Sequence, residues 1–175
     1  ATLYTLPALT DFPKGPRLRL QVLFDRPAAS DVLGTTRIAL RRNVLTMDYF
    51  ADAAWTDQAP AMIQSLLVES LERSGRVTAA SRDTLAIRGD LEVRTDLRHF
   101  EADYRGAEAL PTVRIELGLI LVRVEDRAIV ATGTVTASAR PAKNDVAAIV
   151  VAFDQALHAA MRDTLTWILA NARTR

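Results

Sequence analysis

The chain has 175 residues, of which 49% are apolar and 25% charged, a balance typical of folded domains and unlike that of disordered chains. Lysine plus arginine total 22 against 21 for aspartate plus glutamate, and such neutrality argues against a nucleic-acid partner, which needs a concentrated basic surface. The absence of cysteine excludes disulfides, thiolate metal sites and a cysteine nucleophile. The length predicts one domain over residues 1–175.

The sequence contains neither a membrane-spanning segment nor a recognisable targeting segment. No apolar run reaches the roughly 18 residues that a spanning helix needs. The sequence begins with Ala1 rather than Met and shows no basic and apolar leader. We therefore expect that a targeting segment has been removed.

The first part of the chain is expected to form strands. Residues 1–6 fit a short edge strand, and residues 17–24 alternate polar and apolar side chains, as a half-buried strand does. Residues 36–42 and 45–49 alternate in the same way. Their spacing predicts a hairpin that turns near Arg42–Asn43.

A helix is predicted over residues 59–74. Pro60 suits its first turn, and Gly75 suits the left-handed residue that follows a helix. Glu69 and Arg73 are four residues apart, in the order that favours an ion pair. One stripe faces the core, formed by Ile63, Leu66, Leu67, Ser70 and Leu71.

The second part of the chain predicts four more strands, at residues 77–80, 85–97, 112–124 and 128–139. The last three, with short or moderate connections, indicate an antiparallel meander. Their outward charges alternate in sign, which favours ion pairs between strands over a binding site. Residues 99–111, which include Phe100, Tyr104 and Gly106, are expected to form a long loop, where binding residues often occur.

The chain is expected to close with a helix at about residues 145–171, with Asp145 or Asn144 as its N-cap. The predicted class is α+β: an antiparallel sheet of about six to eight strands, with the helices at about 59–74 and 145–171 packed on one face.

Residues with catalytic spacing are not found. His99 and His158 fall in a predicted loop and on the polar side of a predicted helix, without Asp, Glu or His at metal-ligand spacing. Glycine-rich phosphate-binding motifs and nucleophile motifs are absent. We therefore predict no catalytic, cofactor-binding or metal-binding residues.

Aromatic and arginine side chains gather before the first helix, and these residue types are enriched where proteins dock on proteins. Trp55 has two interpretations: it contacts a partner, with an arginine over its face, or it fastens the helix start to the sheet. On the first interpretation, Trp55→Ala or charge reversal at Arg41 weakens partner binding more than stability. The candidate partner-binding residues are Arg37, Arg41, Tyr49, Phe50 and Trp55.

In these features the chain resembles the ABC-type transport auxiliary lipoprotein family. The likeness extends from Tyr4 to about Ala172 and rests on the order and spacing of short motifs. These motifs are Tyr4-Thr5-Leu6, Ile38-Ala39-Leu40-Arg41, Asp48-Tyr49, Trp55 followed by Pro60, Leu71-Glu72-Arg73-Ser74-Gly75, and the closing helix.

The resemblance implies a non-enzymatic lipoprotein, held in the periplasm on the envelope membrane, with the outer membrane favoured, by an acylated cysteine upstream of Ala1. It implies work with an ABC transporter and an MCE-type substrate-binding protein in moving lipids or other hydrophobic compounds. Assembly into a homo-oligomer is a further expectation. The family supplies no catalytic residues to carry over.

A second hypothesis is a periplasmic carrier that encloses a lipid or another hydrophobic ligand between the sheet and the last helix. The candidate lining residues are Ile120, Val122, Phe153 and Leu157. Copurified lipid favours the carrier, whereas a tightly packed core favours the adaptor.

Overall fold

Strand β7 (Leu91–Asp103) is the centre of the sheet in the computed structural model, which describes residues 1–82, 88–105 and 110–172. On one side β7 pairs with β8 (Thr112–Arg123), which pairs with β9 (Ile129–Ala139), and both pairings are antiparallel. The predicted meander is confirmed. The expected start of its first strand, at Leu85 and Ile87, lies outside the described residues.

The other side of β7 is shared by three strands that all run parallel to it. They are β2 (Leu18–Phe24), β3 (Ala28–Ala29) and β4 (Arg37–Asn43). The sheet therefore divides into two arms beyond β7. It is mixed, because parallel and antiparallel pairs both occur in it.

Each arm is extended by further strands. Beyond β2 lies β6 (Val77–Ser81), and beyond β4 lie β5 (Thr46–Trp55) and then β1 (Thr2–Tyr4). Within the described residues, nine strands form one sheet. The short strand predicted at the N-terminus is thus an edge strand, paired in parallel with β5.

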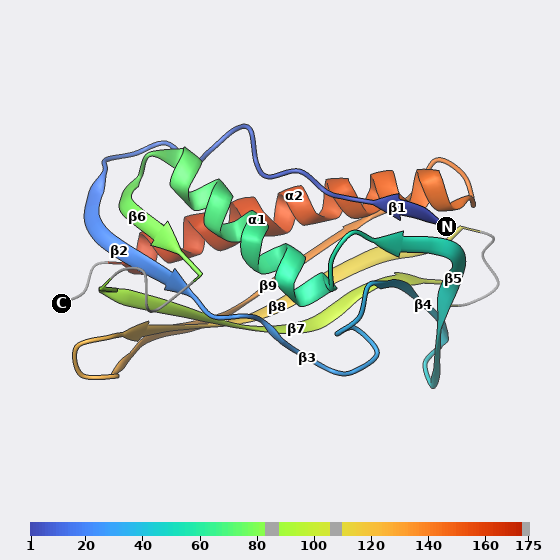
Figure 1. The fold of residues 1–175 in the computed structure, drawn as a ribbon, viewed down its shortest axis with the longest axis horizontal. Coiled ribbons are helices and arrows are strands. Elements are labelled where there is room, and N and C mark those ends of the chain that lie inside the picture. The colour runs from blue at the N-terminus through green and yellow to red at the C-terminus, as the bar shows by residue number, and fades with distance from the viewer. Residues whose placement is uncertain (83–87, 106–109, 173–175) are drawn as a thin grey trace.

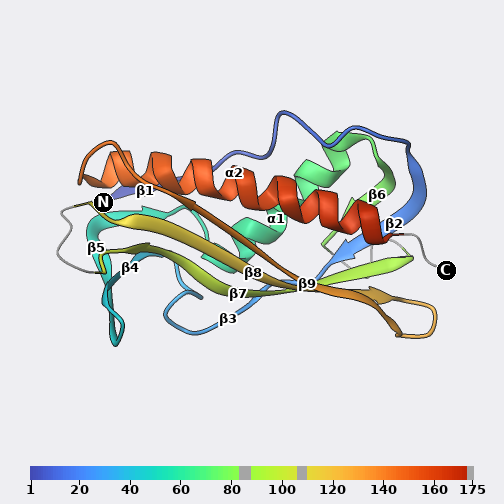
Figure 2. The ribbon, with the colours of Figure 1, turned by 180° about the vertical axis from the view of Figure 1, so that it is seen from behind.

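Both helices, α1 (Ala59–Ser74) and α2 (Val146–Asn171), cover the same face of the sheet (Figures 1 and 2). Gly75 ends α1 with a φ of 68°, a backbone conformation that costs glycine little. Asp145 begins α2, its side chain accepting a hydrogen bond from the Ala148 N–H at 2.8 Å. The α+β class and the placement of both helices are confirmed.

Alternate side chains of the strands fill the space beneath the helices. On β8 the buried row toward α2 is Val113, Ile115, Leu117, Leu119 and Leu121, none of them more than 2% exposed. This row matches the period of two expected from the sequence. The opposite face of the sheet carries the charged side chains.

The segment before β2 runs along the helical layer (Figure 1). Leu9 is completely buried, and its N–H donates to Ser70 Oγ of α1 at 3.1 Å. Asp11 forms an ion pair with Arg162 of α2. The N-terminal segment is therefore fastened to both helices.

Two boundaries differ from the prediction. The β4–β5 hairpin turns at Val44–Leu45, because Asn43 still pairs with Thr46. His99 and Phe100, expected in a loop, belong to β7, because a register shift between Leu97 and His99 interrupts the strict alternation without ending the strand. The expected loop residue Gly106 lies outside the described residues.

Candidate interaction surface

Arg37 and Tyr49 lie together on the face of the sheet that the helices leave open. The Arg37 guanidinium carbon is 4.4 Å from the centre of the Tyr49 ring, a cation–π distance. The Tyr49 hydroxyl donates to the Val32 carbonyl at 2.9 Å, which holds the ring in place. Arg37 is exposed and Tyr49 half-buried, so both are available to a partner.

Trp55 is a core residue, only 1% exposed. Its ring lies 5.5 Å from Phe100 of β7 and 5.1 Å from Phe153 of α2, the latter edge to face. The backbone N–H of Trp55 donates to the Thr36 carbonyl at 2.6 Å. Of its two interpretations, the structure favours the one in which Trp55 fastens the helical layer to the sheet. The arginine expected over Trp55 lies over Tyr49 instead.

Arg41 has a structural role within the β4–β5 hairpin. Its Nε is 3.6 Å from an oxygen of Glu101, a carboxylate that is completely buried. His99 Nδ1 lies 2.8 Å from the same oxygen, and the Phe100 N–H donates to the other at 2.9 Å. Charge reversal at Arg41 would place two carboxylates together in this buried position. We therefore expect charge reversal at Arg41 to lower stability as well as any partner binding.

Phe50 lies apart from the other candidates. Its ring is 6.5 Å from that of Tyr104, whose hydroxyl donates to Asn144 Oδ1 at 2.6 Å, just before α2. Burial raises the pKa of Tyr104. Phe50 itself is half-buried. Through Tyr104 it lies beside the end of β7 and the residues just before α2.

The sequence-based prediction missed the most exposed apolar residues of the β4–β5 hairpin. Val44 and Leu45 form the turn between β4 and β5 and are 67% and 91% exposed. Alternation placed Leu45 in a strand, with Met47 and Tyr49. The available signal was two aliphatic residues directly after Asn43, where a turn was expected.

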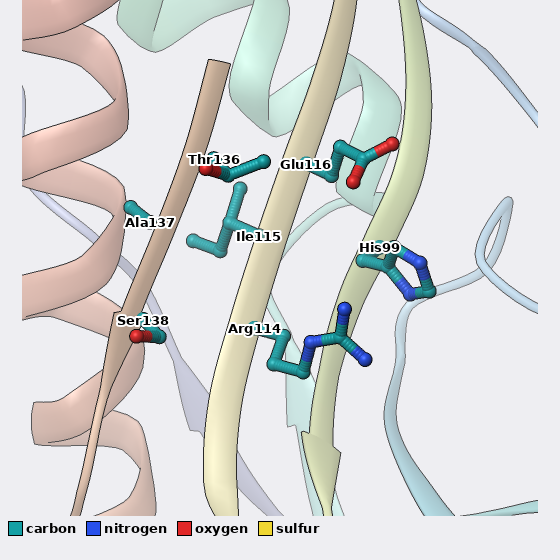
Figure 3. A pocket seen from close by; sticks show the side chains of 7 residues that line it. All are labelled: His99, Arg114, Ile115, Glu116, Thr136, Ala137 and Ser138. Carbon is teal, nitrogen blue, oxygen red and sulfur yellow. The ribbon is translucent and has the colours of Figure 1, made fainter. Parts of the chain in front are cut away.

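The open face of the sheet also has a shallow polar depression of about 450 Å³ (Figure 3). Its charged groups are already paired: Glu116 with Arg98 at 3.5 Å, and Arg114 with Asp103 at 3.3 Å. Its lining comprises His99, Arg114, Ile115, Glu116, Thr136, Ala137 and Ser138. The predicted pairing of outward charges is confirmed here, and the depression is unsuited to an apolar ligand.

A second charged cluster links β2, β7 and the turn after β8. Arg127 donates to Glu92 at 2.7 Å, and Arg94 lies 3.4 Å from Asp25. Burial, together with the hydrogen bond to Glu92 and repulsion from it, raises the pKa of Asp25 from 3.8 to about 6. The same hydrogen bond, with Arg127, lowers the pKa of Glu92. The cluster fastens the β8–β9 turn to the centre of the sheet.

The four candidate lining residues of a carrier pocket do not face one another. Ile120 and Val122 are paired with Arg94 and Glu92 and lie on the open face. Phe153 and Leu157 are completely buried on the helical side. The sheet separates the two pairs, so they cannot line one cavity.

Metal and membrane signals are also absent from the residues that the structure describes. Among them no three His, Cys, Asp or Glu side chains are grouped to hold a metal ion. Each histidine has a carboxylate neighbour that sequence reasoning missed, Glu101 for His99 and, at 3.1 Å, Asp154 for His158. Neither helix, in the ranges described, has the length and apolarity to cross a membrane.

Comparison with known proteins assigns the chain to a class. Residues 4–163 match the family model of the ABC-type transport auxiliary lipoprotein component. Its members are transport components and not enzymes, which agrees with the lack of a catalytic arrangement in the sequence. The chain belongs to the ABC-type transport auxiliary lipoprotein family.

Individual relatives support the fold. The crystal structure of XCC0632 from Xanthomonas campestris is 30% identical and superposes with a TM-score of 0.93, over 99% of this chain and 97% of that one. PelC from Paraburkholderia phytofirmans, solved as a dodecamer, is 12% identical with a TM-score of 0.52, over 88% and 93% of the two chains, and shares the fold alone.

A longer relative also matches. A protein of Bradyrhizobium diazoefficiens is 29% identical over 157 residues, which cover 89% of this chain. This chain spans only 41% of that relative's length.

Proposed function

We propose that this protein is a periplasmic adaptor of an ABC-type envelope transport system and acts by binding partner proteins. Its partners are transporter subunits and an MCE-type substrate-binding protein, and its cargo is lipids or other hydrophobic compounds. An N-terminal lipid anchors it to the envelope membrane, with the outer membrane favoured. The observation that carries the proposal is the family match over residues 4–163.

Arg37 and Tyr49 are the proposed centre of the partner-binding surface. Arginine and tyrosine contribute strongly to protein interfaces because they combine flat apolar area with hydrogen-bonding groups. The stacked pair is held in place by the Tyr49–Val32 hydrogen bond. A partner would therefore meet a preorganised surface, which reduces the entropy lost on binding.

Assembly into a ring is the proposed quaternary state. Among the described strands, β9 pairs only with β8, so its other edge has unpaired backbone groups. The strand runs for 11 residues without a charged side chain or a proline, the devices that usually block pairing at an edge. The dodecamer formed by PelC, which shares the fold, supports the same proposal.

The carrier hypothesis has less support. Its proposed lining is split between the two faces of the sheet, and Phe153 and Leu157 are in contact with the packed core. A carrier needs a cavity that buries most of its ligand. The core beneath the helices is instead filled by side chains from both layers.

Affinity purification of the full-length, membrane-extracted protein from its own host tests the proposal. We expect transporter subunits or an MCE-type protein in the eluate, and their loss in an Arg37→Glu variant. Arg19→Glu, at an exposed arginine of β2 in the other arm of the sheet, is the matched control. A lone chain that retains stoichiometric lipid would contradict the adaptor and support the carrier.

A further inference from the structure

The turn between β4 and β5 presents two aliphatic side chains to solvent. Val44 is 67% exposed and Leu45 91%. Two-residue hairpin turns usually hold asparagine, aspartate or glycine, which tolerate the backbone geometry and water. Exposed aliphatic residues at such a position make this tip a candidate contact site.

The backbone of the tip is already hydrogen-bonded within the hairpin. Arg41 Nη1 donates to the Val44 carbonyl at 3.1 Å, and the Leu45 N–H donates to Asn43 Oδ1 at 2.9 Å. These two groups keep their partners when the tip leaves water, so they add no unpaired polar group to an apolar environment. The same bonds fix the turn, which lowers the entropy cost of binding.

One exposed arginine, Arg42, stands directly behind the tip. Arg42 is 63% exposed along its side chain, and its nearest acidic neighbour, the exposed Asp48, is 3.6 Å away. Arg41 is held by the buried Glu101, so Arg42 is the arginine that this hairpin presents to solvent. Arginine just behind an apolar tip is suited to phosphate at the level of lipid headgroups.

The position of the hairpin also fits a membrane contact. Figures 1 and 2 show the β4–β5 turn projecting from the body of the protein, at the end where the N-terminus lies. Two side chains on a convex tip are too few for a stable protein interface, which buries more than about 1,000 Å² in total. A lipid surface accommodates such a small wedge.

We propose that Val44 and Leu45 insert into the headgroup region of an anionic lipid bilayer, as a second contact beside the N-terminal anchor. The inference rests on the proposed function, which places this end of the protein at a membrane. The contact would fix the orientation of the sheet relative to the bilayer, which a flexible lipid anchor alone does not.

Vesicle binding by the purified 175-residue chain, without its lipid anchor, tests the inference. We expect cosedimentation with vesicles of phosphatidylglycerol and phosphatidylethanolamine, and weaker binding to phosphatidylcholine alone. Leu45→Asp is expected to weaken binding about tenfold, the effect of withdrawing one leucine from an apolar environment. In a Leu45→Trp variant, bromine-labelled acyl chains should quench the new tryptophan emission.

Ile129→Asp is the matched control, because Ile129 is 63% exposed and begins β9 after the turn at the opposite end of the protein (Figure 2). Unchanged melting temperatures show that both variants are folded. Equal binding by the two variants, or no quenching at position 45, would overturn the inference. If Leu45→Asp removes a partner from the host eluate but leaves vesicle binding intact, the tip contacts protein and not lipid. Since vesicles contain no partner protein, the vesicle-binding result does not depend on whether the adaptor proposal is correct.

Discussion

Trp55 illustrates how one aromatic residue can serve the core and not the surface. Its ring fills the space between Phe100 of the sheet and Phe153 of α2, whose rings are themselves 5.0 Å apart. We expect Trp55→Ala to lower the free energy of unfolding by about 3–5 kcal/mol, the usual effect of removing a large buried aromatic side chain. Urea titration followed by circular dichroism measures it.

Leu45→Ala is the control for this prediction, because it truncates a side chain that is 91% exposed. Its effect should remain within about 0.5 kcal/mol. A folded Trp55→Ala protein of normal stability that fails to bind partners would show that Trp55 acts as a partner-binding residue and not as a core residue.

Arg41 and Arg42 are adjacent arginines with different roles. Arg41→Ala leaves Glu101 buried without its arginine partner, and we expect a loss of roughly 2–3 kcal/mol in the free energy of unfolding. Arg42→Ala breaks only the exposed pair with Asp48, so its effect should be below about 1 kcal/mol. Equal losses in the same urea titration would show that the buried pair contributes nothing special.

Asp25 should make stability depend on pH. Its pKa is about 6 in the folded protein and 3.8 when unperturbed, so the folded state binds this proton more tightly, and stability falls as the pH rises between these values. The pKa of Glu92 is lowered from its ordinary value of 4.5, so the effect of Glu92 on stability lies below that pH. Between pH 4.5 and 6 we therefore assign the change in stability to Asp25. Asp25→Asn should flatten the profile in that range, measured by urea unfolding at several pH values. An unchanged slope would contradict the shift.

At the scale of elements, both helices could be predicted closely from the sequence. Proline and glycine mark the ends of α1, the Asp145 cap marks the start of α2, and a stripe of period 3.6 marks the buried face of each. The antiparallel meander was also predictable, because its strands are consecutive in the chain. The parallel pairs of β7 with β2, β3 and β4 were not, because local periodicity contains no information on distant partners.

The buried stripe of α1 gives the prediction at this scale. Leu66 is 8% exposed and faces the core, so Leu66→Asp buries a charge without a partner and should abolish cooperative thermal unfolding. Glu72→Asp, an exposed change on the same helix, should leave the melting temperature nearly unchanged. A Leu66→Asp protein that melts cooperatively at the normal temperature would show that the helix face is assigned wrongly.

The candidate site was only partly predictable. Arg37 and Tyr49 do form a surface pair, because both project from the open face of neighbouring strands. Trp55 was misplaced in the first interpretation because composition at interfaces and in cores overlaps for aromatic residues. The exposed tip at Leu45 was missed because alternation continues through a turn when the turn itself holds apolar residues.

At the scale of the whole molecule, the packed core and the open polar face agree with a protein that acts through its surface. The N-terminal segment is fastened to α1 and α2 by Leu9 and Asp11. Any force on the proposed N-terminal lipid anchor would therefore pass directly to the folded body. This arrangement suits a component that holds other proteins at a membrane.

Native mass spectrometry of the assembly, gently extracted from host membranes, tests the adaptor account most directly, since one spectrum gives partners, copy number and bound lipid. The account predicts a mass that contains several copies of this chain together with a transporter subunit or an MCE-type protein. A single copy of the chain, with only the added mass of a bound lipid beyond its own anchor, would contradict it.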